Sequence, residues 1–283
     1  MYAHFGLRDW LMNKENRYQP TSMTPTQHHR HGLWPRAETV EDLQRNLAAV
    51  RERIAAAARR VGRDPNEVRL LPVSKEVDEA RIRMAYEAGC RFLAENRPQE
   101  LARKYEALRD LTDLKWSVIG HLQTNKAKLV VRYAAEFQAL DSLRVAEVLD
   151  RRLQAEGRAL DVYVQVNTSG EPSKYGLHPE EVATFLRKMR AFSSLRLRGL
   201  MTLAVFSTDS ERVRQCFILL RTLRDTLRQE VDAGLTELSM GMSGDFEIAI
   251  EEGATVVRVG QAIFGSRKTP DARYWPSSDQ PRR

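Results

Sequence analysis

The segment LLPVSK (residues 70–75) is apolar up to Val73 and then ends on Ser74 and Lys75. Its first four residues and the two residues before them form VRLLPV (68–73), a run typical of a short buried strand. A lysine directly after such a strand is not informative alone, because most lysines are solvated surface residues. Its meaning depends on how many similar strands the chain contains and on which residues stand at their ends.

Seven more short runs rich in β-branched and other apolar residues follow this one, at 91–94, 115–120, 137–140, 160–166, 195–201, 236–240 and 255–259. Helical stretches separate them, and a last helix is expected near Ala262. A long amphipathic helix precedes the first strand, with Thr39 as its cap and Gly62 at its end. Eight strands, each followed by a helix, predict an α/β fold, a single (β/α)8 TIM barrel. The alternative, a doubly wound open sheet, would need unusual width.

The two ends of the chain lack this pattern. Residues 1–37 are rich in polar residues, carry HHRH at 28–31 and show no sustained periodicity, so we expect a disordered N-terminal extension. Residues 38–270 are assigned to the barrel, which needs about 250 residues in total. Residues 271–283 remain as a C-terminal tail, and no segment is left for a second domain.

Composition narrows the class of protein. A formal charge of +7 would suit a protein that binds nucleic acid or a membrane surface, but the basic residues are spread over helices that also carry Glu and Asp. No apolar run reaches membrane-spanning length, and the N-terminus lacks a secretory signal. Cys90 and Cys216 form neither a disulfide framework nor a metal-ligand spacing. We therefore expect a cytoplasmic protein that binds no metal, nucleic acid or membrane.

In a barrel of this type the functional site lies at the C-terminal ends of the strands. These ends concentrate polar residues and glycines, whereas the strand interiors are predicted to be apolar. The residues at or just after the ends are Ser74, Lys75, Glu95, Asn96, Gly120, His121, Gln123, Asn125, Lys126, Asp141, Ser142, Asn167, Lys174, Gly176, Met201, Thr202, Ser243, Arg258 and Gly260. Their concentration predicts a binding site at this end of the barrel.

The last two strand ends, GMSGDFE (241–247) and RVGQAIFG (258–265), predict a phosphate site. Their glycines let backbone amides approach an anion, and Ser243 adds a hydroxyl. Asp245 and Gln261 lie at or near helix starts, where unpaired N–H groups favour negative charge. The same glycines also suit tight strand-to-helix turns, and the two interpretations are compatible.

Three interpretations of Lys75 remain open beside such a site. It is a charge partner for the phosphate, a solvated residue, or an amine that forms a Schiff base with an aldehyde, its pKa lowered by apolar surroundings and by lysines such as Lys126 or Lys174. A phosphorylated aldehyde there is pyridoxal phosphate (PLP) or a sugar-phosphate substrate of an aldolase. Arg258 suits the ring nitrogen of PLP and, because it cannot give up its proton, would leave the ring a weak electron sink.

Seven motifs resemble the pyridoxal-phosphate homeostasis protein family. They are VSK (73–75), AENRPQE (94–100), IGHLQTNK (119–126), VNTSGEPSKYG (166–176), RGLMT (198–202), LSMGMSGD (238–245) and VRVGQAIFG (257–265). The resemblance, over residues 40–268, implies a barrel like the N-terminal domain of alanine racemase. It implies PLP held as an aldimine on Lys75, with its phosphate on Ser243, Gly260 and Gln261. The candidate cofactor-binding residues are Lys75, Asn96, His121, Asn167, Met242, Ser243, Arg258, Gly260 and Gln261.

The family also implies a monomer that buffers PLP or delivers it to PLP-dependent apo-enzymes, without robust catalysis of its own. The alternative is a racemase-like enzyme on the same site, for which His121 or Lys126 would have to be the second acid–base group beside Lys75. Four residues depart from the family pattern: Gln261, Glu76, Ala94 and Pro98. They put cofactor affinity and exchange in question, since Gln261 lacks a hydroxyl and Glu76 adds a negative charge beside the lysine.

Overall fold

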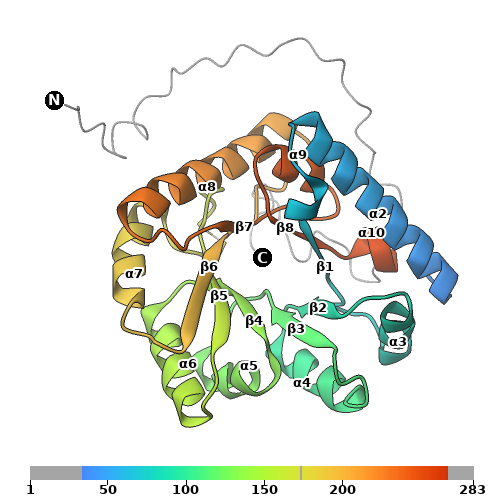
Figure 1. Cartoon of the computed structure of the whole chain (residues 1–283), viewed down its shortest axis with the longest axis horizontal. Helices are drawn as coiled ribbons and strands as arrows, with labels where there is room; N and C mark the ends of the chain where they lie inside the picture. The colour runs from blue at the N-terminus through green and yellow to red at the C-terminus, as the bar shows by residue number, and fades with distance from the viewer. Residues whose placement is uncertain (1–33, 173, 267–283) are drawn as a thin grey trace, which may run out of the picture. The chain divides into compact units, whose positions relative to one another are not determined.

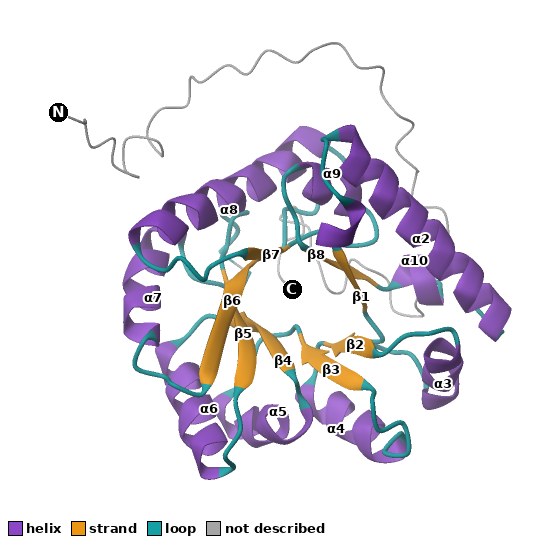
Figure 2. Cartoon of the chain, in the orientation of Figure 1, coloured by secondary structure: helices purple, strands orange, loops and turns teal. Residues whose placement is uncertain are grey.

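The computed structural model describes residues 34–172 and 174–266 of the 283-residue chain. Eight parallel strands form one sheet, and helices surround it (Figures 1 and 2). The strands are β1 (Arg69–Pro72), β2 (Phe92–Glu95), β3 (Lys115–Val118), β4 (Glu136–Leu140), β5 (Leu160–Gln165), β6 (Leu195–Met201), β7 (Glu237–Ser239) and β8 (Val256–Val259). Each coincides within two residues at either end with a predicted strand.

The sheet closes into a barrel. Its strand order is β1-β8-β7-β6-β5-β4-β3-β2, so β1 and β2 stand at its two edges. These edges meet where Val73 bridges Ala94 in parallel and the amide of Ser74 donates to the carbonyl of Ala94 at 3.0 Å. The predicted (β/α)8 barrel is therefore confirmed, and the open-sheet alternative is wrong.

The α-helices are α2 (Val40–Arg60), α3 (Glu79–Glu87), α4 (Pro98–Ala107), α5 (Ala127–Tyr133), α6 (Leu143–Ala155), α7 (Val182–Met189), α8 (Ser210–Glu230), α9 (Phe246–Glu251) and α10 (Gln261–Phe264). Three short 3-10 turns are η1 (Pro65–Glu67), η2 (Thr124–Lys126) and η3 (Pro179–Glu181). Among the described residues, none of these helices is long and apolar enough to cross a membrane.

The first helix begins and ends as its sequence predicts. Thr39 caps α2, because its hydroxyl accepts the amide of Asp42 while the Asp42 carboxylate accepts the amide of Thr39. Gly62 follows the last turn with φ +70°, a left-handed conformation that glycine adopts without steric cost. The buried face of α2 packs against α9 and α10, beside β8. The helix α2 thus covers the junction of the first and last strands (Figure 1).

The barrel interior is polar, which differs from the expected apolar strand interiors. Arg258 donates to the Ser239 hydroxyl at 2.7 Å, Ser239 donates to Gln138 at 2.7 Å, and Gln138 donates to Glu136 at 2.7 Å. Arg69 on β1 then donates to Glu136 on β4 at 2.6 Å. Successive strand residues point to opposite sides, so the apolar residues of the same strands face the helices while these polar side chains fill the barrel.

Residues 34–37, assigned from sequence to the N-terminal extension, lie against the end of α10. The amide of Ala37 donates to the carbonyl of Phe264 at 3.3 Å, and the amide of Ser266 donates to the carbonyl of Trp34 at 2.9 Å. Ala37 is buried. The predicted extension and C-terminal tail otherwise lie outside the described residues, and the division of the chain into three parts stays a prediction.

Candidate functional site at the carboxyl ends of the strands

The first and last strands bring Lys75 beside the glycine-rich turn after β8. Pro72 is the register partner of Val259, and the amide of Val73 donates to the carbonyl of Val259 at 2.9 Å. Lys75 stands two residues past Val73, and Gly260 stands one residue past Val259. Residues separated by 185 positions in the sequence therefore meet at one end of the barrel, where a parallel barrel places its site.

Ser243 occupies the centre of the predicted phosphate site. Its Oγ accepts the backbone amides of Gly260 at 3.2 Å and Ala262 at 3.4 Å. Two N–H groups from the start of α10 thus converge on a single oxygen. An oxygen of a phosphate group can take the same place, with the Ser243 hydroxyl turned from acceptor to donor.

The loop before Ser243 has a conformation that requires glycine. Gly241 has φ +95°, and a Cβ built on it would lie 2.7 Å from the Cβ of Ala249 and 2.8 Å from the Cα of Phe246. Asp245 fastens the other side of the loop, since its Oδ1 accepts the amide of Met242 at 2.6 Å. Burial raises the pKa of Asp245, while the Met242 amide and the Arg258 guanidinium act in the opposite direction. Met242 and Ser243 are therefore held in a tight turn over α9.

Arg258 lies below this turn with 2% of its surface exposed. Nη1 donates to Ser239 and Nη2 donates to the carbonyl of Thr202 at 2.7 Å. Burial lowers the pKa of Arg258 to about 10, against the opposing effect of Asp245. At neutral pH the guanidinium stays charged, and two of its five N–H donors are used by these partners.

Asn167 organises the loop after β5. Its Nδ2 donates to the carbonyls of Glu171 and Lys174 at 2.9 and 3.3 Å, and its Oδ1 accepts the Ser169 hydroxyl and the Gly170 amide at 3.0 and 3.2 Å. These bonds use its side-chain amide within the loop, so a direct contact from Asn167 to a cofactor stays a prediction.

His121, after β3, is enclosed from two sides. Its ring stacks on Tyr175 with centroids 3.8 Å apart and planes 9° apart, and its Nδ1 lies 3.4 Å from Oδ2 of Asp141. Tyr175 comes from the loop after β5 and is 59% exposed. The structure thus brings the ends of β3, β4 and β5 together, as the sequence predicted.

Asn96, after β2, is half-buried and lies against the end of β3, because a Cβ on Gly120 would lie 2.1 Å from its carbonyl oxygen. Glu95, the preceding strand-end residue, faces the other way. Its Oε1 accepts Lys104 of α4 at 2.6 Å, behind the barrel wall. Burial raises the pKa of Glu95, with Lys104 opposing. The Glu95 side chain therefore packs between β2 and α4 and does not face the predicted site.

Sequence reasoning missed Lys104, Gln138 and Ser239. Lys104 stands on the apolar face of α4, one turn after Leu101 and one turn before Leu108, which was a signal for burial. Gln138 alternates with apolar neighbours in EFQAL (136–140), a pattern that also suits a solvated strand face. Among the described residues, no group of three or more His, Cys, Asp or Glu side chains is placed to hold a metal ion.

The chain resembles known proteins over most of its length. Residues 45–268 match the family of the alanine racemase N-terminal domain. A pyridoxal phosphate homeostasis protein of Aquifex aeolicus is 43% identical over 222 residues, which cover 78% of this chain and 97% of that protein. A pyridoxal phosphate homeostasis protein of Escherichia coli is 40% identical over 236 residues, covering 81% and 98% of the two chains.

Solved structures agree with this match. PipY of Synechococcus elongatus, determined with PLP bound, has a TM-score of 0.71 and 36% sequence identity, and the similarity covers 79% of this chain and 100% of PipY. An alanine racemase of Clostridium difficile has the same fold at a TM-score of 0.62 and 16% identity, covering 82% of this chain and 58% of the racemase.

The barrel and its carboxyl-end site define the class: a single barrel of the alanine racemase N-terminal-domain type. Within that class, the identities of 43% and 40% over nearly the full length of two relatives decide the matter. The chain belongs to the pyridoxal phosphate homeostasis protein family.

Proposed function

We propose that this protein binds PLP at the carboxyl end of the barrel and serves in PLP homeostasis, as a store and donor of the cofactor. The observation that carries the proposal is the convergence of the Gly260 and Ala262 amides on the Ser243 hydroxyl, next to the strand that leads to Lys75. That arrangement fits a phosphorylated aldehyde, with an anion cradle and an amine on neighbouring strands. Family membership favours PLP over a sugar phosphate.

Each candidate residue has a part in this proposal. Lys75 supplies the amine that binds the aldehyde carbon covalently, and Ser243 with the amides of Gly260 and Ala262 receives the phosphate. Gln261, which replaces a hydroxyl residue of the family, contributes its backbone amide. Arg258 would face the ring nitrogen, while Asn96, His121, Asn167 and Met242 would border the ring. These assignments rest on the strand ends that carry the residues.

Bound PLP supplies an electrophilic aldehyde and an electron-withdrawing ring. With a pKa of about 10, Arg258 remains protonated at neutral pH, so the group facing the ring nitrogen would be a donor that keeps its proton. Such a partner favours retention of the cofactor over carbanion chemistry. We therefore propose a storage and delivery role, in which a cytoplasmic monomer passes PLP to apo-enzymes. The weak electron sink counts against the alternative of a racemase-like enzyme on the same site.

Lysine replacement tests the covalent site. Borohydride treatment of the PLP-loaded protein followed by peptide mass spectrometry should find the reduced adduct on Lys75. Lys75→Ala should lose the adduct and the yellow absorbance with its circular dichroism unchanged, whereas Lys128→Ala, on the exposed side of α5, should keep both. An adduct that persists in Lys75→Ala would refute the assignment of this lysine.

Isotope exchange separates the storage role from the enzymatic alternative. Amino acids incubated with the loaded protein in deuterated water should gain no deuterium at Cα beyond the rate given by free PLP. Rapid exchange that depends on Lys75 would favour the racemase-like enzyme. For the delivery role, transfer to an apo-enzyme should proceed faster than the dissociation of PLP into buffer measured with a small-molecule aldehyde trap.

A further inference from the structure

Two side chains of α4 hold the backbone on both sides of Lys75. Nζ of Lys104 donates to the carbonyl of Ser74 at 2.7 Å, and Oε1 of Glu100 accepts the amide of Glu76 at 3.3 Å. The first group belongs to the peptide before Lys75 and the second to the peptide after it. Lys104 and Glu100 are themselves paired at 2.9 Å, one helical turn apart.

Lys104 is an unusual residue to find in this place. Its side chain is 0% exposed, and a buried ammonium group is costly unless all its donors are satisfied. Its three N–H donors have three partners: the Ser74 carbonyl, Oε1 of Glu95 and Oε1 of Glu100. Glu95 also accepts the Ser74 hydroxyl at 2.6 Å. The cluster therefore binds both the main chain and the side chain of the residue before Lys75.

The residue after Lys75 needs such support. Glu76 has φ +64°, the left-handed conformation that costs a residue with a Cβ roughly 1 kcal/mol. It is the residue other than glycine with positive φ within the described ranges. Because the direction of a side chain follows from the backbone on either side of it, relaxation of this turn would redirect the amine of Lys75.

We propose that the Lys104–Glu100 pair is a positioning device for Lys75, which fixes the turn so that the amine meets the PLP aldehyde and which thereby sets the rate of cofactor release. This inference rests on the proposed covalent role of Lys75. Lys104 and Glu100 approach from behind the barrel wall and act through the backbone, so they are positioning residues without contact to the cofactor.

Two ligands separate positioning of the amine from support of the whole site. Binding of PLP depends on both the amine and the phosphate cradle, which is the Ser243 hydroxyl with the amides of Gly260 and Ala262. Pyridoxine 5′-phosphate has an alcohol in place of the aldehyde, so its binding depends on the cradle alone. Glu100→Ala should weaken PLP binding about tenfold, the factor expected for one hydrogen bond to a charged group. The affinity for pyridoxine 5′-phosphate should change less than about twofold, because the bonds of Ser243 are untouched.

The matched control is Glu106→Ala, the same change on an exposed residue of the same helix. It should leave both affinities unchanged. Glu100→Gln keeps an oxygen acceptor at this position and should restore most of the PLP affinity. Glu100 is 21% exposed at the side chain, so its replacement should leave the protein folded by circular dichroism.

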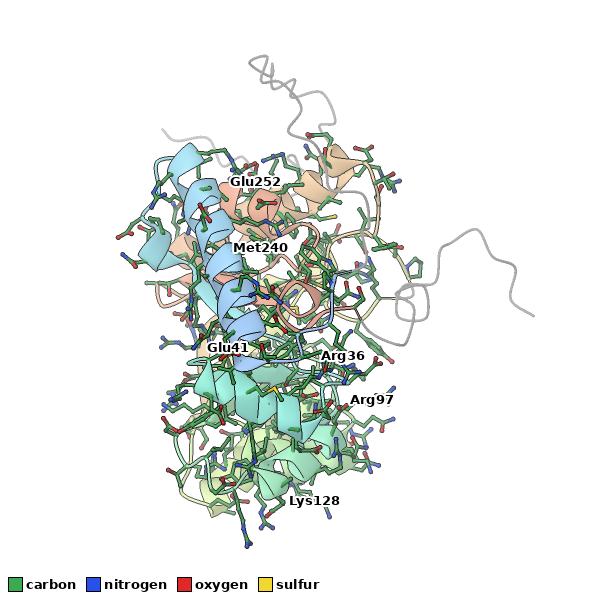
Figure 3. The ribbon with its side chains drawn as sticks, turned by 90° about the vertical axis from the view of Figure 1, so that its right-hand side faces the viewer. Arg36, Glu41, Arg97, Lys128, Met240 and Glu252 are labelled. Atoms are coloured by element: carbon green, nitrogen blue, oxygen red, sulfur yellow. The ribbon has the colours of Figure 1, made fainter. Side chains whose placement is uncertain are left out.

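Lys104→Met tests the other half of the device. It should accelerate PLP release more than Glu100→Ala does, whereas Lys128→Met, on an exposed lysine labelled in Figure 3, should not. If Lys104→Met fails to fold, the Glu100→Ala and Glu100→Gln variants, with Glu106→Ala as control, test the inference without it. Equal PLP affinity in Glu100→Ala and Glu106→Ala would overturn the inference, and so would equal losses for both ligands. If borohydride reduction of the PLP-loaded wild-type protein gave no adduct at Lys75, that result would instead overturn the proposed function.

Discussion

Replacement of Ser243 by alanine tests the cradle in both its empty and its loaded state. The Ser243 hydroxyl accepts two amides, one at 3.2 Å, the long end of the ordinary N–H···O range, and one at 3.4 Å, beyond it. Together we expect them to contribute about 1 kcal/mol to the free energy of unfolding. For a domain of this size, that loss lowers the melting temperature of Ser243→Ala by about 2–4 °C.

The loaded state loses a different bond. A hydroxyl that donates to a phosphate oxygen contributes about 1.5–3 kcal/mol. Wild-type protein must first release its two amides from the hydroxyl, which costs about 1 kcal/mol, and the variant avoids this cost. The net loss of binding free energy is thus about 1 kcal/mol, or about fivefold in the dissociation constant.

Spectroscopic titration with PLP and with pyridoxal, which lacks the phosphate, measures this effect. The Ser243→Ala variant should lose affinity for PLP and keep its affinity for pyridoxal. Ser207→Ala is the control, because the Ser207 hydroxyl accepts the amide of Asp209 at 3.1 Å in another loop; it should keep both affinities. A lower melting temperature with unchanged PLP affinity would refute the reasoning and make the Ser243 hydroxyl a partner of the empty cradle alone.

Three further predictions concern buried or closely packed residues. Arg258→Met should lower the free energy of unfolding by about 2 kcal/mol in urea titrations, because the buried Ser239 hydroxyl and a strand carbonyl lose their charged donor. Gly120→Ala should cost about 1–3 kcal/mol, since its Cβ would lie 2.1 Å from the carbonyl oxygen of Asn96. Burial raises the pKa of the Cys90 thiol to about 11, so iodoacetamide at pH 8 should modify it about a hundredfold more slowly in native than in unfolded protein.

The Cys90 shift also has a consequence for stability, measured by urea titration at several pH values. The pKa of Cys90 is higher in the folded protein than its ordinary value of 9.0. The contribution of the buried thiol to the free energy of unfolding is therefore fully present below pH 9.0 and is lost as pH rises toward about 11. Labelling at equal rates in native and unfolded protein would contradict the assigned burial. Unchanged unfolding free energies in Arg258→Met or Gly120→Ala would contradict the polar interior and the close packing of the β2 and β3 ends.

The order of strands and helices could be predicted because it is a local property. The apolar and β-branched residues of a run such as LDVYVQV (160–166) are enough to predict a strand. Thr39 and Gly62 mark the bounds of α2 through backbone interactions within a few residues. Since parallel strands of one barrel end on one side, the residues after each strand are gathered there by topology alone. The sequence therefore predicts that Lys75 and Ser243 share one end of the barrel.

The direction of polar side chains was not predictable in this way. Glu95 and Asn96 are neighbours at the end of one strand, yet Glu95 faces α4 behind the wall, where it binds Lys104. The pattern of EFQAL (136–140) is the same for a solvated strand and for a polar barrel interior, and the reach of Arg69 to Glu136 decides between them.

The sequence by itself therefore determined the number and order of the elements, the family, and the end of the barrel that carries the lysine and the glycine-rich turns. Only the tertiary structure decided which polar residues face the interior, which face the helices, and that Lys104 is buried against the peptide before Lys75. The physical reason is that strand and helix patterns are set by neighbours in the chain. Burial of a charged group is set by its partners in the folded chain. Packing of α4 on its own strand brings Glu95 to Lys104, and closure of the barrel brings Ser74.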